Sequence, residues 1–167
     1  SINEYTITWI DGDGETLKTE QVAYGQTPAY TGKTPTKTAT AQYTYAFNDT
    51  WSPAIASVTE DATYTAQFGS TVNEYSYTIH HYLLGTEERV KDDQTGTVDY
   101  GTEIEVLKAT NYRDTDLRVN TEDPTQKITV REGINVTTIF YTLPLTITPN
   151  SSSKTYGANE PKLTATV

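Results

Sequence analysis

One arrangement of residues occurs twice in the chain and limits what it can fold into more than any other feature. Residues 4–28 and residues 74–103 each run through an extended segment, a turn, a second extended segment and a Tyr-Gly bend. The two bends are Tyr24-Gly25 and Tyr100-Gly101, and a further Tyr-Gly pair follows at Tyr156-Gly157. This repetition predicts a modular chain, with two complete modules and the start of a third.

The extended segments have the alternation of β-strands. Tyr5, Ile7 and Trp9 alternate with other residues, which places them on one face of a strand. The Asp-Gly pairs of residues 11–14 follow and predict a hairpin. The chain contains 13 Tyr, a residue that suits a pleated, half-buried surface, and apolar residues nowhere keep helical spacing for more than about a turn. The predicted fold class is mainly β, α+β at most.

Aromatic residues are predicted to form most of the core of the first module. The proposed members are Tyr5, Ile7, Trp9, Tyr43, Tyr45, Phe47, Trp51, Tyr64 and Phe68. Residues 69–73, Gly-Ser-Thr-Val-Asn, are rich in turn formers and predict a short hinge after this module. The predicted domains are residues 1–72, 73–143 and 144–167. The last is expected to be an incomplete module, because about twenty residues are too few for a core.

The composition excludes two classes of partner. A net charge of −10 and a pI near 4.5 repel phosphate groups, so neither nucleic acid nor an anionic membrane surface is expected to bind. No apolar run approaches the ~20 residues that span a bilayer, so no membrane insertion is expected. The chain has no Cys. This argues against a disulfide-stabilised secreted module and fits either a cytosolic protein or a bacterial surface protein.

Few residues suggest chemistry. His80 and His81 are the only histidines, and neighbours on a strand point to opposite faces, so the two cannot hold one metal or share one proton. One is expected to be buried and the other solvated. Residues 11–14 lack the further oxygen ligands of a calcium loop, and Asp92-Asp93 is interpreted as a solvated turn. No catalytic, metal or cofactor-binding residue is predicted, ligand-binding residues are unknown, and the chain is predicted not to be an enzyme.

Parts of the sequence resemble known repeats of Gram-positive surface proteins. Residues 4–70 resemble the internalin-type B-repeat (Listeria–Bacteroides repeat) through YTITW, VAYGQTP and ATYTAQF, and through Phe47 and Trp51 followed by Ser-Pro. Residues 73–143 resemble the mucin-binding-protein (MucBP) repeat through YTIHHYLLGT, DPTQKITV and NVTTIFYT, although Asn111 stands where that family usually has Gly. Residues 145–167 are similar to the opening of the MBG repeat.

These resemblances imply two tandem β-grasp-like modules, each a small mixed sheet around a short helix or loop, joined end to end in an elongated chain. They also imply an extracellular location on the bacterial cell wall or surface, and a non-enzymatic role in adhesion to host or matrix, or as a stalk. The expected partners are host mucin or glycan and flanking repeats of the same chain. Two alternatives stay open. One is a specific mucin- or glycan-binding module, in which outward Tyr and Thr contact sugars; the other is a purely mechanical spacer.

Overall fold

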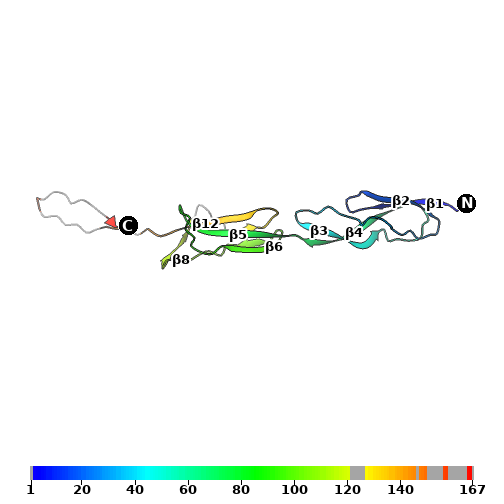
Figure 1. Ribbon diagram of the computed structural model, residues 1–167. Helices are drawn as coiled ribbons and strands as arrows, with labels where there is room; N and C mark the ends of the chain where they lie inside the picture. The colour runs from blue at the N-terminus through cyan, green and yellow to red at the C-terminus, as the bar shows by residue number, and fades with distance from the viewer. Residues whose placement is uncertain (1, 121–126, 146, 150–155, 158–164, 167) are drawn as a thin grey trace. The chain divides into compact units, whose positions relative to one another are not determined.

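The computed structural model is built from β-strands in the part of the chain that it describes (Figure 1). The described residues are 2–120, 127–145, 147–149, 156–157 and 165–166. No helix occurs among them. The mainly β fold class predicted from the alternating segments is therefore confirmed.

The first sheet is mixed, with a parallel pair at its centre. It consists of β1 (Glu4–Ile10), β2 (Thr16–Ala23), β3 (Tyr43–Ser52) and β4 (Ala62–Val72), in the order β2-β1-β4-β3. β1 and β2 form the predicted antiparallel hairpin, β1 and β4 are parallel, and β3 and β4 are antiparallel. A small mixed sheet agrees with the β-grasp-like expectation, but no helix accompanies it among the described residues.

The second sheet repeats this order. It consists of β5 (Glu74–Leu83), β6 (Gln94–Asp99), β10 (Arg118–Val119) and β12 (Asn135–Thr142), in the order β10-β12-β5-β6. β5 and β12 form the central parallel pair, as β1 and β4 do in the first sheet. The recurring sequence pattern is therefore a recurring sheet topology.

Short two-stranded ladders complete the described strands. β7 pairs with β11, β8 with β9, and β13 with β14, all antiparallel. Their bounds are Glu103–Glu105 and Lys127–Thr129, Asn111–Tyr112 and Thr115–Asp116, and Thr148–Pro149 and Ala165–Thr166. Most of the predicted third module lies outside the described residues.

Contacts divide the chain into two compact units. Unit 1 comprises Ser1–Ser76, Thr97–Thr102 and Val130–Ile134. Unit 2 comprises Tyr77–Gly96, Glu103–Thr129 and Asn135–Val167. The domain limits predicted from the sequence differ from these units and stay a prediction.

The hinge predicted at residues 69–73 is a strand for most of its length. β4 continues to Val72, which pairs with Tyr43 of β3. Turn propensity is a local preference, and pairing with a neighbouring strand outweighs it here. The hinge prediction is therefore wrong for residues 69–72.

The core of unit 1 is smaller than the predicted aromatic cluster. Ile7, Trp9, Val58 and Tyr64 form its buried centre. The Trp9 ring lies 4.9 Å from the Tyr64 ring and 4.7 Å from the Trp51 ring, centroid to centroid. Such contacts add about 0.5–1.5 kcal/mol each beyond the area that they bury.

Several of the predicted aromatic residues lie outside this core. The parallel pairing of β1 with β4 ends at Thr65, and β4 continues beyond it against β3. On that extension Phe47 packs against Phe68, with ring centroids 5.9 Å apart, and Tyr43 lies 6.4 Å from Tyr45. These residues form a row on a two-stranded ribbon because β1 does not reach that part of β4.

The core of unit 2 has an equivalent position on the second sheet. Ile79, Ile139 and Tyr141 are fully buried, and Val106 lies beside them. Ile79 comes from β5, whereas Ile139 and Tyr141 are alternate residues of β12 and so share one face.

Backbone hydrogen bonds join the first Tyr-Gly bend, which follows β2, to the segment between β3 and β4. The Tyr24 N–H donates to the Asn3 carbonyl and the Gly25 N–H donates to the Val58 carbonyl, each at 2.8 Å. The Val58 N–H in turn donates to the Gln26 carbonyl at 2.8 Å. Gly25 adopts a φ of +83°, a conformation that favours glycine.

The second Tyr-Gly bend repeats these hydrogen bonds, and it also lies in unit 1. The Tyr100 N–H donates to the Asn73 carbonyl, and the Gly101 N–H donates to the Val130 carbonyl, both at 2.8 Å. The Val130 N–H donates to the Thr102 carbonyl at 2.9 Å. Each bend thus forms backbone hydrogen bonds with one buried valine of the segment that leads back to the sheet.

Substituting Gly25 tests the bend. Because a side chain at positive φ costs roughly 1–2 kcal/mol, Gly25→Ala should lower the free energy of unfolding of unit 1 by about that amount. Both tryptophans, Trp9 and Trp51, lie in unit 1, so their fluorescence in a urea titration measures the loss. Gly69→Ala is the matched control, since open space surrounds it and its φ is not positive. Equal losses in both variants would contradict the role of the bend.

Candidate functional site

The two histidines lie on opposite faces of β5, as the alternation predicts. His81 is fully buried. The His80 ring lies on the other face, with Nδ1 3.0 Å from Asp93 Oδ2, an ion-pair distance without hydrogen-bond geometry. Arg89 approaches the same carboxylate oxygen at 3.4 Å. The pair therefore forms no common site.

His81 forms a buried hydrogen-bonded chain in unit 2. Its Nδ1 lies 2.8 Å from the Tyr141 hydroxyl, which accepts the Ala109 N–H at 3.0 Å. If the hydroxyl donates to Nδ1, its proton is used, and within this hydrogen-bonded chain only Nε2 of His81 has no partner. This assigns a neutral ring with its proton on Nε2. Burial, followed by the charge of Lys91, lowers the pKa of His81, and burial raises the pKa of Tyr141.

Asp11 holds the place of His81 in the first copy of the pattern. It lies eight residues after Asn3, as His81 lies eight after Asn73, and both side chains are buried. Asp11 Oδ1 accepts the N–H groups of Asp13 and Glu15 at 3.0 and 2.9 Å. This carboxylate organises the hairpin turn. No group of three metal-ligating side chains occurs in the part of the chain that the structure describes.

The pKa of His81 predicts a pH dependence of stability. An unfolded histidine has a pKa of about 6.5, and the folded pKa lies below it. Below about pH 6.5 the unfolded chain therefore binds more protons than the folded one. As the pH is lowered through this range, the free energy of unfolding decreases by at most about 1.4 kcal/mol per pH unit. Above that pH this contribution is fully present. Urea midpoints measured by circular dichroism between pH 7.5 and 5 check it.

Two variants separate this effect from the titration of other groups. His81→Gln retains an acceptor for the Tyr141 hydroxyl, and its midpoint should depend less on pH than that of the parent chain. His80→Gln, on the opposite face, should keep the slope that His81 causes. Tryptophan fluorescence reports unit 1 and should give the same pH dependence in the parent and in His81→Gln. An unchanged circular dichroism slope in His81→Gln would contradict the assignment.

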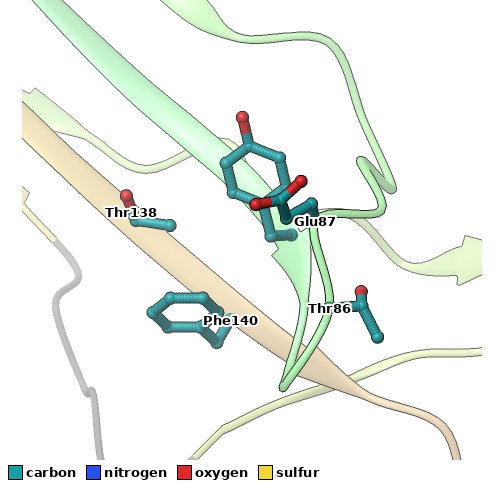
Figure 2. A pocket seen from close by; sticks show the side chains of 5 residues that line it. Thr86, Glu87, Thr138 and Phe140 are labelled. Carbon is teal, nitrogen blue, oxygen red and sulfur yellow. The ribbon is translucent and has the colours of Figure 1, made fainter.

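A pocket lies on the outward face of β5 and β12, opposite the core of unit 2. Its volume is about 470 Å³, and it is lined by Tyr82, Thr86, Glu87, Thr138 and Phe140. We call it the β5–β12 pocket. Figure 2 shows Thr138 and Phe140 on one strand, and Thr86 and Glu87 on the turn at the end of the neighbouring strand.

Strand register brings the two aromatic residues of this pocket together. In the parallel pairing of β5 with β12, Tyr82 is opposite Phe140, and His80 is opposite Thr138. Residues two apart share a face, so Thr138 and Phe140 point outward while Ile139, between them, is buried. Tyr82 and Phe140 are only half-buried. Both residues line the pocket and are partly open to solvent.

The turn after β5 supplies the polar side of the pocket. Gly85 has a φ of +75°, which lets the chain reverse directly after Leu84. The Thr86 hydroxyl donates to the Leu83 carbonyl at 2.9 Å and accepts the Glu88 N–H at 3.0 Å. These bonds fix the backbone on either side of Glu87, whose carboxylate is exposed beside the aromatic rings.

The charge of the pocket is negative. Glu87 is the only formally charged residue among those that line it. Arg89 lies over the Tyr82 ring, 5.8 Å from its centroid, but is ion-paired with Asp93. The pocket thus combines apolar rings, hydroxyl groups and one acidic acceptor. This combination can hold the apolar face of a small ring and accept hydrogen bonds from its hydroxyl groups.

Unit 1 has a smaller pocket without aromatic residues. Its volume is about 280 Å³, and it is lined by Thr6, Thr8, Asp61, Ala62 and Thr63. Asp61 Oδ1 accepts the Thr6 N–H at 2.7 Å, so this carboxylate already serves the backbone. Of these two pockets, only the β5–β12 pocket is lined by aromatic residues.

The sequence by itself assigns no role to Tyr82 or Phe140. Each occurs in an alternating segment, and nothing in either segment states which strand lies beside it. The signal that points to them is an outward aromatic residue close to a turn of polar residues. It becomes specific only when the parallel register is known.

Comparisons with known proteins give distant structural similarities. No family model matches the chain, and no curated protein matches it. Domains 3–4 of streptococcal SHIRT repeats (Streptococcal High Identity Repeats in Tandem) from a cell surface protein are 14% identical, cover 84% of this chain and 98% of theirs, and give a TM-score of 0.38. Mub-RV is 14% identical, covering 86% and 100%, with a TM-score of 0.29.

A type 2 repeat of the mucus binding protein MUB from Lactobacillus reuteri is also similar. It is 13% identical, covers 86% of this chain and all of that one, and has a TM-score of 0.27. TM-scores below 0.5 do not establish a shared fold or function. The MucBP resemblance of residues 73–143 stays a prediction. The B-repeat resemblance of residues 4–70 and the MBG resemblance of residues 145–167 stay predictions. No helix among the described residues is long and apolar enough to cross a membrane.

Proposed function

We propose that this chain is a non-enzymatic, carbohydrate-binding segment of a bacterial surface adhesin, and that the β5–β12 pocket takes the sugar. The observation that carries the proposal is that strand register places two partly exposed aromatic residues, Tyr82 and Phe140, opposite each other in one pocket. The MucBP-like segments of residues 73–143 support the same class of ligand. Host mucin or another host glycan is the proposed partner, and the bacterial cell wall or surface is the proposed location.

The pocket chemistry fits a pyranose ring. A sugar presents an apolar face of C–H groups and a rim of hydroxyl groups, so it needs both a flat apolar surface and polar partners. The rings of Tyr82 and Phe140 each offer an apolar face, and the hydroxyls of Thr86 and Thr138 can donate or accept hydrogen bonds beside them. A volume of about 470 Å³ falls within the ~300–1,000 Å³ typical of ligand pockets.

The electrostatics favour a neutral sugar over an acidic one. Glu87 accepts hydrogen bonds from sugar hydroxyls but repels a sialic acid carboxylate or a sulfate group. The net charge of −10 acts in the same direction over a longer range. We therefore propose an unsialylated, unsulfated glycan as the ligand.

Replacing the rings tests the site. Aromatic contacts of about 0.5–1.5 kcal/mol each imply that Tyr82→Ala or Phe140→Ala lowers affinity roughly two- to tenfold. Binding of the full chain to desialylated gastric mucin on a sensor surface measures this, with an array of neutral oligosaccharides to identify the sugar. Tyr156→Ala is the matched control, because it removes a fully exposed tyrosine remote in sequence from the pocket.

Two outcomes would decide against carbohydrate binding in this pocket. If the parent chain gives no signal on mucin or on the array, the mechanical spacer is favoured. If Tyr82→Ala and Tyr156→Ala lose binding equally, the pocket is not where the glycan binds. Circular dichroism of each variant checks that the strands are intact.

Glu87 gives a separate prediction. Glu87→Gln keeps the size and hydrogen-bonding groups of the side chain but removes its charge. Binding to native, sialylated mucin should rise relative to desialylated mucin, and the difference between parent and variant should shrink as salt screens the charge. An identical preference in both proteins, at low salt, would show that Glu87 does not select against acidic sugars.

A further inference from the structure

Within unit 1, Asn73 and Tyr75, at the start of β5, form hydrogen bonds with the backbone of residues 40–42. The Asn73 N–H donates to the Gln42 carbonyl at 2.8 Å. The Asn73 side-chain amide donates to the carbonyls of Thr40 and Ala41 at 2.9 and 3.2 Å. The Tyr75 hydroxyl donates to the Ala41 carbonyl at 2.7 Å. Two residues thus use four donor contacts on three consecutive carbonyl groups.

The acceptor segment is shaped for this contact. The Thr40 N–H donates to the Tyr43 carbonyl at 2.8 Å, and the Tyr43 N–H donates to the Thr40 hydroxyl at 3.0 Å. This turn precedes β3 and leaves the carbonyls of Thr40, Ala41 and Gln42 free to accept from Asn73 and Tyr75. The same segment therefore offers a fixed row of acceptors.

The start of the chain carries the same donors in the same order. Ile2-Asn3-Glu4-Tyr5 corresponds to Val72-Asn73-Glu74-Tyr75. The Asn3 carbonyl accepts from the first bend as that of Asn73 accepts from the second. Tyr5 meets Tyr24 at 6.4 Å between ring centroids, and Tyr75 meets Tyr100 at 6.3 Å. The two segments are equivalent in backbone bonds and in ring contacts.

The two segments differ in what their outer groups contact. Val72 pairs with Tyr43 of β3 and is partly buried. Ile2, in the equivalent place, is 74% exposed. Among the described residues, no hydrogen bond joins the Asn3 side-chain amide or the Tyr5 hydroxyl to an acceptor. Ile2 and Asn3 are exposed, Tyr5 is half-buried, and all three lack the outer contacts that Val72, Asn73 and Tyr75 make; we call these three residues the N-terminal docking surface.

We propose that the N-terminal docking surface binds the acceptor turn of a further module of the same kind as residues 2–72. This partner fits because the donor groups of Asn3 and Tyr5 require three consecutive backbone carbonyls, and Ile2 requires the end of an antiparallel strand beside them. Residues 40–43 with residue 72 supply that arrangement to Asn73 and Tyr75. Stacking of modules through this contact is independent of the β5–β12 pocket.

An added module tests the proposal. Residues 2–72 are joined directly to Asn3 of the full chain, so that Val72 precedes Asn3 as it precedes Asn73. The backbone amide of the junction Asn3 is followed by hydrogen exchange and NMR. It should exchange at least tenfold more slowly than Asn3 of the parent chain, because it now donates to a Gln42 carbonyl.

Hydroxyl deletions supply the matched comparison. Tyr75→Phe should lower the urea midpoint of the parent chain, whereas Tyr5→Phe should leave it unchanged. In the extended protein, Tyr5→Phe at the junction should lower the midpoint by about as much as Tyr75→Phe does in the parent. Tyr156→Phe, at an exposed tyrosine, should have no effect in either protein.

The proposal is overturned if the junction amide exchanges as fast as in the parent chain. It is also overturned if the added module fails to fold in front of Asn3. The fluorescence change on unfolding should be about twice that of the parent chain if the second pair of tryptophans lies in a folded module. Equal effects of Tyr5→Phe in the parent and in the extended protein would assign Tyr5 to internal packing. None of these results bears on carbohydrate binding, which is measured separately on the parent chain.

Discussion

The fold depends on a parallel strand pair at the centre of each four-stranded sheet. β1 pairs with β4, and β5 with β12. Parallel neighbours cannot be joined by a tight turn, so the chain must leave the sheet and cross back before the second strand begins. The register of the pair then decides which side chains are buried, because a shift of one residue would turn every side chain to the opposite face.

The Tyr-Gly bend explains how a chain with few apolar residues holds that crossing in place. Only 35% of the residues are hydrophobic, and no described helix covers either sheet. Instead, the bend exchanges backbone hydrogen bonds with the segment around Val58, and its second copy does so around Val130. Buried backbone groups need partners, and here the same bonds that satisfy them also fix a buried apolar side chain.

Sequence patterns predicted the features that short-range physics determines. The hairpin at residues 11–14, the alternating strands and the two bends follow from local turn chemistry and from period-two alternation. Val58 entered the core, and residues 69–72 became strand, because of partners distant in the sequence. The pairing of Tyr82 with Phe140 has the same origin, so the candidate site was beyond prediction from either segment alone.

Comparing the two sheets shows which side-chain positions the fold constrains and which can differ. The equivalent buried positions Asp11 and His81 make unlike hydrogen bonds: Asp11 Oδ1 accepts from a hairpin turn, and His81 Nδ1 bonds to Tyr141. The outward positions carry no packing constraint, and a sheet topology alone implies no function. Half-exposed rings at Tyr82 and Phe140 leave apolar area in water that the fold does not need. A ligand that covers those rings would remove that cost, which is the physical reason to look for binding at this face of the second sheet.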